Sequence, residues 1–352
     1  MSSPRLRCAG GLLLAAAVLS TPPVAVRIDA APSSCGLEGV ERIVAVGDVH
    51  GAYDRFVDIL RAASVIDGRQ RWAGGRTHLV QLGDIVDRGP DSRKALDLLR
   101  RLDRDASSAG GGVHVLLGNH EVARMLGDLR YVDPGEYRAF VTSDSEEIRR
   151  RFVESAKTAD RDQLDQLLKA TPLGSIEMRI AFGPNGEYGK WLRTLDAVVK
   201  IDGVLFLHGG ISLAVAPLSC DDINVTVRRE LTTDFDATRS APFASLAARE
   251  DGPLWYRGLA ERLDTFSPQV DDVLAKQGAQ AIVIAHTVSP TGRIRLRFGG
   301  KVVQIDTGMQ PAYVTNGRAS ALEIRNGRFT AIYQDRRDPL DVTSLSQQLA
   351  ER

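Results

Sequence analysis

The sequence predicts an α/β fold built around a parallel sheet. Three successive segments each show an apolar run, a turn of glycine and polar residues, and a helical pattern. Strand–turn–helix units in a row imply crossover connections, which join parallel strands. A second observation is that metal-ligand residue types gather where the apolar runs end, and open α/β sheets hold their ligands at the carboxyl ends of strands.

The composition is typical of a globular protein. Of the 352 residues, 43% are hydrophobic and 26% are charged, and the formal net charge is 0. This length allows one large domain or two ordinary ones. Because a neutral chain lacks the basic footprint of nucleic-acid binding, no nucleic-acid partner is expected.

Residues 1–31 have the pattern of a secretory signal peptide. Arg5 and Arg7 precede an apolar core at 12–19, and small residues follow it. The core is shorter than the roughly 20 residues of a membrane-spanning helix. We therefore expect a secreted or periplasmic protein with no stable membrane span after leader cleavage, and an uncleaved anchor is the alternative. Residues 32–38 are expected to form a linker.

Export would leave two cysteines in the mature chain. Cys8 would be removed with the leader, so Cys35 and Cys220 would enter an oxidising compartment. A disulfide between them and two unpaired thiols remain equal alternatives, because a sequence does not show which side chains are close.

The first three strands are expected at 40–46, 78–82 and 113–117. They end in Gly47-Asp-Val-His-Gly51, Gly83-Asp-Ile-Val-Asp-Arg-Gly89 and Gly118-Asn-His-Glu121. Helices are expected at 53–63 and 92–102, the second capped by Asp91 or Ser92.

Residues 122–195 interrupt this rhythm with polar, helix-prone sequence, which predicts a helical insertion. Apolar runs then predict strands at 197–201, 204–207 and 281–285. Alternating runs predict closing antiparallel strands at 293–298, 302–305, 320–325 and 329–333, with hairpin turns at Gly299-Gly300 and Asn326-Gly327. One domain at 39–335 and a tail at 336–352 follow from this division.

Five strand ends carry chemistry-bearing residues: Asp48 and His50; Asp84, Asp87 and Arg88; Asn119 and His120; His208; and His286. Taken singly, each has an ordinary explanation. A histidine after a strand is usually a satisfied core or turn residue, and asparagine is a favoured helix N-cap. Taken together, five coincidental placements among only six histidines are a poor explanation.

A site for two metal ions accounts for the whole set. Ions roughly 3.5–4 Å apart need a bridging carboxylate with oxygen and nitrogen ligands from several strands. We assign Asp84 as the bridge, Asp48 and His50 to one ion, and Asn119, His208 and His286 to the other. A solvent hydroxide between the ions would be the nucleophile, and such mixed ligands suit manganese, iron or zinc.

These motifs resemble those of phosphoprotein phosphatases of the calcineurin-like metallophosphoesterase superfamily, over roughly residues 40–333. Within that superfamily, the segments 125–132, 187–192 and 253–258 are similar to Shewanella-like protein phosphatases. The resemblance implies a four-layer α/β/β/α sandwich and two metal ions, manganese or iron with zinc.

The resemblance also implies roles for individual residues. His120 would be the general acid and Asp87 its partner, while Arg88, Asn119 and Arg257 would bind the phosphoryl group. Residues 306–308 would be structural. The chain lacks a recognisable C-terminal tyrosine-bearing loop like that of the eukaryotic serine/threonine enzymes, so the toxin sensitivity and the substrate groove of those enzymes are not assumed for it.

The expected activity is hydrolysis of phosphomonoesters on proteins. Plant members of the resembled group favour phosphotyrosine, which makes it a candidate substrate. The alternative substrates are small phosphoesters or dinucleoside polyphosphates. An inactive metal-binding adaptor is the alternative of a different class, and the presence of His120 and Asp87, which are not metal ligands, argues against it.

Overall fold

The computed structural model describes residue 33, residues 35–156 and residues 160–342. The leader expected at 1–31 lies outside the described residues, as do residues 343–352 of the expected tail. None of the helices in the described ranges is long and apolar enough to cross a membrane.

The first sheet has six strands in the order β11-β10-β9-β1-β2-β3. They are β1 (Arg42–Val46), β2 (His78–Gln81), β3 (Gly112–Val115), β9 (Ala321–Arg325), β10 (Arg328–Ile332) and β11 (Arg337–Leu340). As expected, β1, β2 and β3 pair in parallel. Because β11 pairs with β10, the tail expected from residue 336 begins too early: the sheet continues to Leu340.

The second sheet has five strands in the order β4-β5-β6-β8-β7. They are β4 (Val198–Ile201), β5 (Val204–Leu207), β6 (Ala281–Ile284), β7 (Arg295–Arg297) and β8 (Val302–Gln304). The purely antiparallel ending expected from the sequence is wrong for β8, which pairs in parallel with β6 and antiparallel only with β7. The strands β5, β6 and β8 therefore end at one edge of the sheet.

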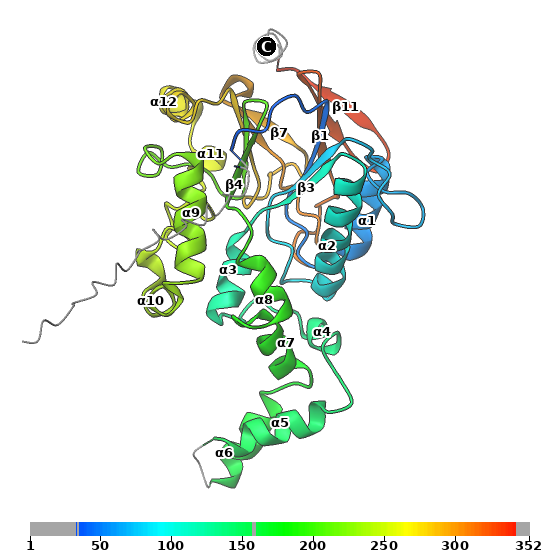
Figure 1. Ribbon diagram of the computed structural model, residues 1–352, viewed down its shortest axis with the longest axis vertical. Coiled ribbons are helices and arrows are strands. Elements are labelled where there is room, and N and C mark those ends of the chain that lie inside the picture. The colour runs from blue at the N-terminus through cyan, green and yellow to red at the C-terminus, as the bar shows by residue number, and fades with distance from the viewer. Residues whose placement is uncertain (1–32, 34, 157–159, 343–352) are drawn as a thin grey trace, which may run out of the picture. The chain divides into compact units, whose positions relative to one another are not determined.

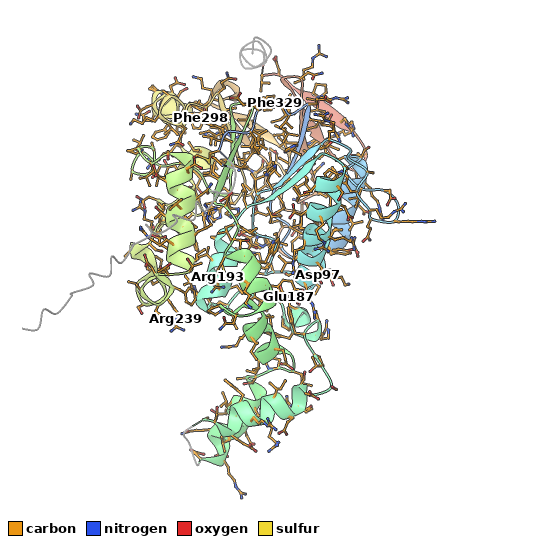
Figure 2. The ribbon with its side chains drawn as sticks, viewed as in Figure 1. Asp97, Glu187, Arg193, Arg239, Phe298 and Phe329 are labelled. Carbon is orange, nitrogen blue, oxygen red and sulfur yellow. A yellow bond between two sulfur atoms is a disulfide. The ribbon has the colours of Figure 1, made fainter. Side chains whose placement is uncertain are left out.

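The two sheets pack face to face, with helices on their outer faces. Ile43 and Ala45 of β1 belong to the core between the sheets, where Phe329 of β10 also lies (Figure 2). Val44 and Val46 point the other way, as strand alternation requires. The first sheet is covered by α1 (Tyr53–Ala62) and α2 (Ser92–Ser108), and the second by α9 (Cys220–Leu231) and α12 (Ser267–Gln277) (Figure 1). The predicted four-layer α/β/β/α class is confirmed.

The described residues between β3 and β4 form six helices: α3 (Asn119–Leu126), α4 (Pro134–Arg138), α5 (Ser145–Glu154), α6 (Arg161–Lys169), α7 (Ser175–Phe182) and α8 (Glu187–Leu192). In Figure 1, α3 and α8 lie beside the sheets, whereas α5 and α6 lie far from them. Short helices fill the rest of the second half: α10 (Phe235–Ser240), α11 (Gly258–Glu261), η1 (Pro242–Ala244), η2 (Asp264–Phe266) and η3 (Phe298–Gly300).

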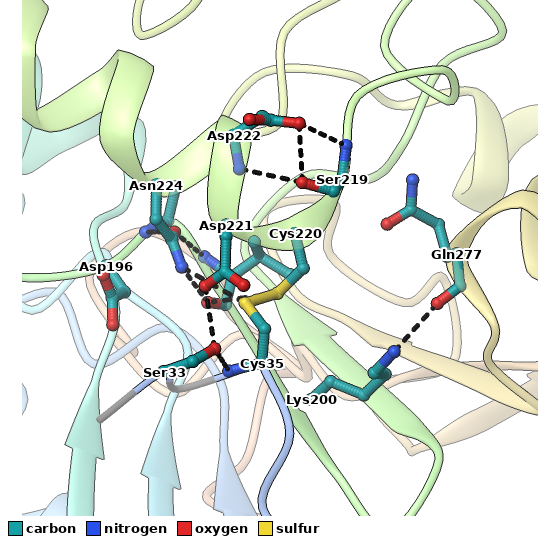
Figure 3. Close-up of a disulfide and its surroundings, with 12 residues drawn as sticks. Ser33, Cys35, Asp196, Lys200, Ser219, Cys220, Asp221, Asp222, Asn224 and Gln277 are labelled. Carbon is teal, nitrogen blue, oxygen red and sulfur yellow. Dashed lines mark hydrogen bonds between the residues drawn. A yellow bond between two sulfur atoms is a disulfide. The ribbon is translucent and has the colours of Figure 1, made fainter. Parts of the chain in front are cut away.

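The segment before β1 is fastened to the second sheet. Cys35 and Cys220 form a disulfide with a Cα–Cα distance of 5.8 Å (Figure 3). Leu37 bridges to Ile201, and the Asp202 carboxylate accepts hydrogen bonds from the backbone just before β1. The stretch expected as a linker is therefore held at several points, and of the two alternatives for the cysteines the structure has the disulfide.

Candidate active site

The ends of the parallel strands from both sheets meet at one place. His208, directly after β5, has its Nδ1 atom 2.7 Å from the carbonyl oxygen of Leu82 at the end of β2. The backbone N–H of His286, after β6, donates to Asp48 Oδ1 at 3.0 Å. These bonds tie the strand ends of one sheet to those of the other, so the side chains predicted from separate motifs share one site.

The backbone at this site is held in an unusual conformation. Positive φ values occur at His50 (47°), Asp84 (52°), Asp87 (71°), Arg88 (64°) and His286 (64°). Such values are uncommon for residues other than glycine and concentrate at functional sites, where the surrounding structure enforces them. Half of the ten positive-φ residues other than glycine in the described ranges lie here.

Glu121 enforces part of this conformation. Its buried carboxylate accepts hydrogen bonds from the backbone N–H groups of Asp84 (2.8 Å), Ile85 (2.8 Å) and Gly118 (2.9 Å). The sequence motif contained Glu121 without indicating a role for it. The structure shows that it holds the turn that carries Asp84 against the start of α3.

Asp84 stands between two groups of metal-ligand side chains. One group is His50, Asp84 and His120, the other is Asp84, His208 and His286, and the ligand atoms within each lie within 4.8 Å of one another. Asp84 Oδ2 is 3.2 Å from His208 Nε2 and 3.6 Å from His50 Nε2. A carboxylate shared in this way is the arrangement that a bridged pair of ions requires.

The remaining predicted ligands flank these groups. Asp48 Oδ2 lies 3.6 Å from His50 Nε2, and Asn119 Oδ1 lies 3.0 Å from His208 Nε2. The structure therefore brings together all six residues that we assigned as ligands. All six are buried.

The electrostatics of the carboxylates fit a cation site. Burial, with the nearby Asp306 and Asp84 carboxylates, raises the pKa of Asp48 well above its usual value. Burial also raises the pKa of Asp306 to about 6. Burial would raise the pKa of Asp84 too, but His208 and His120 lower it, so Asp84 remains ionised. Carboxylates buried this close together are stabilised by a bound cation.

The lowered pKa values of two imidazoles also indicate a cation site. Burial lowers the pKa of His50 to about 4. Burial, His208 and Arg257 lower the pKa of His286 well below its usual value. Neutral imidazoles keep the nitrogen lone pair that a metal ion needs. The donor set of carboxylates, imidazoles and an amide oxygen therefore fits manganese, iron or zinc.

His120 differs from the other histidines of the site. Its Nδ1 atom is bonded to Asp87 Oδ2 at 2.7 Å. Burial lowers the pKa of His120, but Asp84 and Asp87 outweigh it and raise the pKa above the usual value. Although His120 Nε2 lies 3.9 Å from Asp84 Oδ2, a histidine that favours its charged form is suited to proton donation rather than to metal ligation.

Two arginines face the same small cavity of about 90 Å³. Arg88 Nη2 is 3.4 Å from His120 Nε2, and among the described residues nothing accepts a hydrogen bond from the buried Nε of Arg88. Arg257 donates to the His286 carbonyl oxygen (2.9 Å) and to Thr287 Oγ1 (3.0 Å), so its guanidinium is held at the rim. A larger cavity of about 560 Å³, lined by Glu38, Glu41 and Asp202, contains none of the predicted site residues.

Two tyrosines, Tyr131 and Tyr313, also line the cavity. The Arg88 guanidinium lies 3.7 Å from the centre of the Tyr313 ring and 5.0 Å from that of Tyr131. Tyr313 lies between β8 and β9, so a C-terminal loop that was not recognisable in the sequence does bring a tyrosine to the site. Its segment has no periodicity or turn signal that would have pointed to the site, and only the path of the loop places it there.

A bridging carboxylate between two ligand groups, on the shared edge of an α/β/β/α sandwich, defines a dimetal hydrolase site. The model of the calcineurin-like phosphoesterase family matches residues 41–290. The chain belongs to this family and is a metal-dependent phosphatase.

Named relatives agree with this assignment. The chain is 28% identical over 272 residues to Shewanella-like protein phosphatase 1 of Plasmodium berghei, covering 76% of this chain and 67% of that protein. It is 29% identical over 302 residues to Shewanella-like protein phosphatase 2 of Arabidopsis thaliana, covering 82% and 76%. The crystal structure of a cold-active protein-tyrosine phosphatase of a psychrophile Shewanella species matches with a TM-score of 0.68 at 29% identity, covering 87% and 82%.

Proposed function

We propose that this phosphatase hydrolyses phosphomonoesters on proteins, with phosphotyrosine as the favoured residue. The observation that carries the proposal is the position of His120: it is bonded to Asp87 on one side and lies 3.9 Å from the shared Asp84 carboxylate on the other. A proton donor beside a dimetal site is what cleavage of a phosphomonoester with a poor leaving group needs.

Two divalent or trivalent ions, manganese or iron with zinc, would supply a solvent nucleophile of lowered pKa and neutralise charge on the phosphoryl oxygens. Asp48, His50 and Asp84 would hold one ion. Asp84, Asn119, His208 and His286 would hold the other. The pKa directions support a cation beside these residues: a bound cation would offset the burial and the neighbouring carboxylates that disfavour the ionised form of Asp48, and the lowered pKa of His50 leaves its imidazole neutral.

Arg88 and Arg257 would orient the phosphoryl group. Both guanidinium groups face the cavity, and the Nε of Arg88 retains a free donor among the described residues. Guanidinium groups bind phosphoryl oxygens through charge-assisted hydrogen bonds. His120 would then donate its Nε2 proton to the leaving oxygen, with Asp87 stabilising the charged imidazole.

The preference for phosphotyrosine is supported by the rings at the rim. Tyr131 and Tyr313 are both partly exposed, at 40% and 47%, and flank Arg88. An aromatic leaving group can pack against such rings, whereas a serine side chain offers no ring to pack. The structural relative described above is named a protein-tyrosine phosphatase, which favours the same substrate.

The test is turnover of a phosphotyrosine peptide, a phosphoserine peptide and diadenosine tetraphosphate, each measured with manganese and with iron plus zinc. We expect the phosphotyrosine peptide to give the highest kcat/KM. A preference for the dinucleotide would favour the alternative function. Absence of turnover on all three substrates, with two ions bound, would favour the adaptor.

We also propose that the protein is exported, with residues 1–31 removed as a leader. The Cys35–Cys220 disulfide supports this location, because structural disulfides persist mainly in oxidising compartments. Cell fractionation with N-terminal sequencing of the mature protein tests the proposal. Recovery of the intact N-terminus in the cytosol would contradict it.

A further inference from the structure

The Asp87 carboxylate has a second partner behind it. One oxygen is bonded to His120 Nδ1, and the other accepts from the guanidinium of Arg124. Arg124 is one turn after His120 on α3, so both side chains leave the same face of the helix. Its side chain is 1% exposed, which excludes a role in binding solvent or substrate directly.

Arg124 also connects the catalytic turn to the helical insertion. Its guanidinium donates to Glu136 of α4 and lies 4.9 Å from the centre of the Phe182 ring of α7. Glu136 in turn accepts from the backbone N–H of Asp87 at 3.0 Å and from the Ser92 hydroxyl at the start of α2. Arg124 and Glu136 thus hold both the carboxylate and the backbone of Asp87.

A buried ion pair of this kind contributes little to the net stability of a fold. Moving charged groups out of water costs free energy that their mutual attraction often does not recover. A protein with apolar side chains of similar volume in their place is usually as stable. What the hydrogen bonds of a guanidinium add is direction, because its N–H groups lie in one rigid plane: one Nη of Arg124 donates to Asp87 Oδ1 and the other to Glu136 Oε2. Of these two carboxylates, Asp87 is the one that orients His120.

We propose that Arg124 is a positioning residue for proton donation. It fixes Asp87 so that the His120 ring presents Nε2 to the leaving oxygen, and through Glu136 it makes that orientation depend on α4. The inference rests on the proposed role of His120 as the general acid. When Arg124 is lost, we expect protonation of the leaving group to suffer, while metal binding and phosphoryl binding remain.

The test uses two aryl phosphates that differ in their need for a proton. p-Nitrophenyl phosphate has a good leaving group, whereas phenyl phosphate has a poor one that depends on the acid. The variant is the double substitution Arg124→Met with Glu136→Gln. It removes one buried positive and one buried negative charge together, so the net buried charge is unchanged and Asp87 keeps its bond to His120.

We expect kcat of the double variant to fall at least about tenfold more on phenyl phosphate than on p-nitrophenyl phosphate, as partial loss of a general acid predicts. Metal content should match that of the wild type. His120→Asn provides the reference for complete loss of the acid. Arg179→Met, an exposed arginine of α7 that lines a neighbouring small cavity with Arg124, is the matched control and should behave as the wild type.

A loss of equal size on both substrates, or no loss, would overturn the inference and leave Arg124 a purely structural residue. If the double variant does not fold, Arg124→Lys decides by the same comparison, because lysine keeps the charge without the rigid pair of Nη donors that holds Asp87 and Glu136 together. Failure of the proposed function would look different: the wild-type enzyme itself would show no turnover of either aryl phosphate.

Discussion

The six histidines of the chain form two groups with different surroundings. Four follow the carboxyl ends and lie among carboxylates: His50, His120, His208 and His286. The other two lie within β2 and β3, where His78 Nδ1 is 2.9 Å from His114 Nε2 and the two rings stack. The first group makes a site, and the second makes a contact within the fold.

The difference shows what a buried histidine needs in order to carry chemistry. Burial and, to a smaller extent, the neighbouring His78 lower the pKa of His114 to about 4. This pair is therefore neutral in the folded protein. Burial acts on His120 in the same direction, but Asp84 and Asp87 reverse the effect and raise its pKa. Residue type and burial are therefore insufficient, and the neighbouring carboxylates decide the function.

We expect the largest loss of metal binding and turnover when Asp84, the ligand shared by both ions, is replaced. Asp84→Asn is expected to lower the content of both metal ions, because a neutral amide cannot bridge two cations as a carboxylate does. Loss of an outer-sphere partner alone costs about 10- to 100-fold in metal affinity or activity, so turnover should fall further than that. Elemental analysis and kcat measure both effects, with His114→Gln as a control outside the site cavity. Retention of two ions would contradict the bridging role.

We expect the next largest loss of turnover when the general acid is removed and the metal ions stay bound. His120→Asn is expected to lower turnover about 10²-fold or more, the range for loss of general acid catalysis, with the metal content unchanged. Turnover and elemental analysis of the same preparation check this result. If the ions are lost with the imidazole, His120 is a ligand and the assignment of the acid is wrong.

The pH profile should distinguish His120 from an ordinary histidine. The acid works in its protonated form, so turnover is expected to fall as the pH rises through its pKa, which lies above the usual value of 6.5. Asp87→Asn removes one of the two carboxylates that raise this pKa and should move the basic limb to lower pH. The measurement is kcat against pH for both proteins. An unmoved limb would show that another group controls it.

The smallest effect concerns the stability contributed by the pair of His78 and His114. In the unfolded chain His114 titrates near 6.5, but in the folded protein it titrates at about 4. Its stabilising contribution is therefore complete above pH 6.5 and is lost as the pH falls towards 4. We expect the wild type to lose about 2 kcal/mol more than His114→Gln between pH 7 and pH 5. Urea unfolding of both proteins at the two pH values measures this difference, and an equal loss in both would contradict the assignment.

Short-range chemistry made much of the molecule predictable. The turn at Asn326-Gly327 joins β9 to β10 as expected, because both residues accept the positive φ values, 49° and 69°, that a tight hairpin turn requires. The ligand candidates were recognisable because parallel strands present their carboxyl ends together. The end of α2 was less predictable: the helix continues to Ser108 through a polar stretch in which Ala106 is the one buried residue.

Apart from β11, the sequence by itself determined the strands, the turns and the residue types at the site, since these depend on alternation and on turn chemistry over a few residues. Only the tertiary structure decided the direction of β8, the disulfide of Cys35 with Cys220, the position of Tyr313 and the contact of Arg124 with Asp87. Each of these depends on which distant surfaces pack together. Local propensity carries no information about such packing, because the free energy that selects it comes from burying side chains across the whole domain.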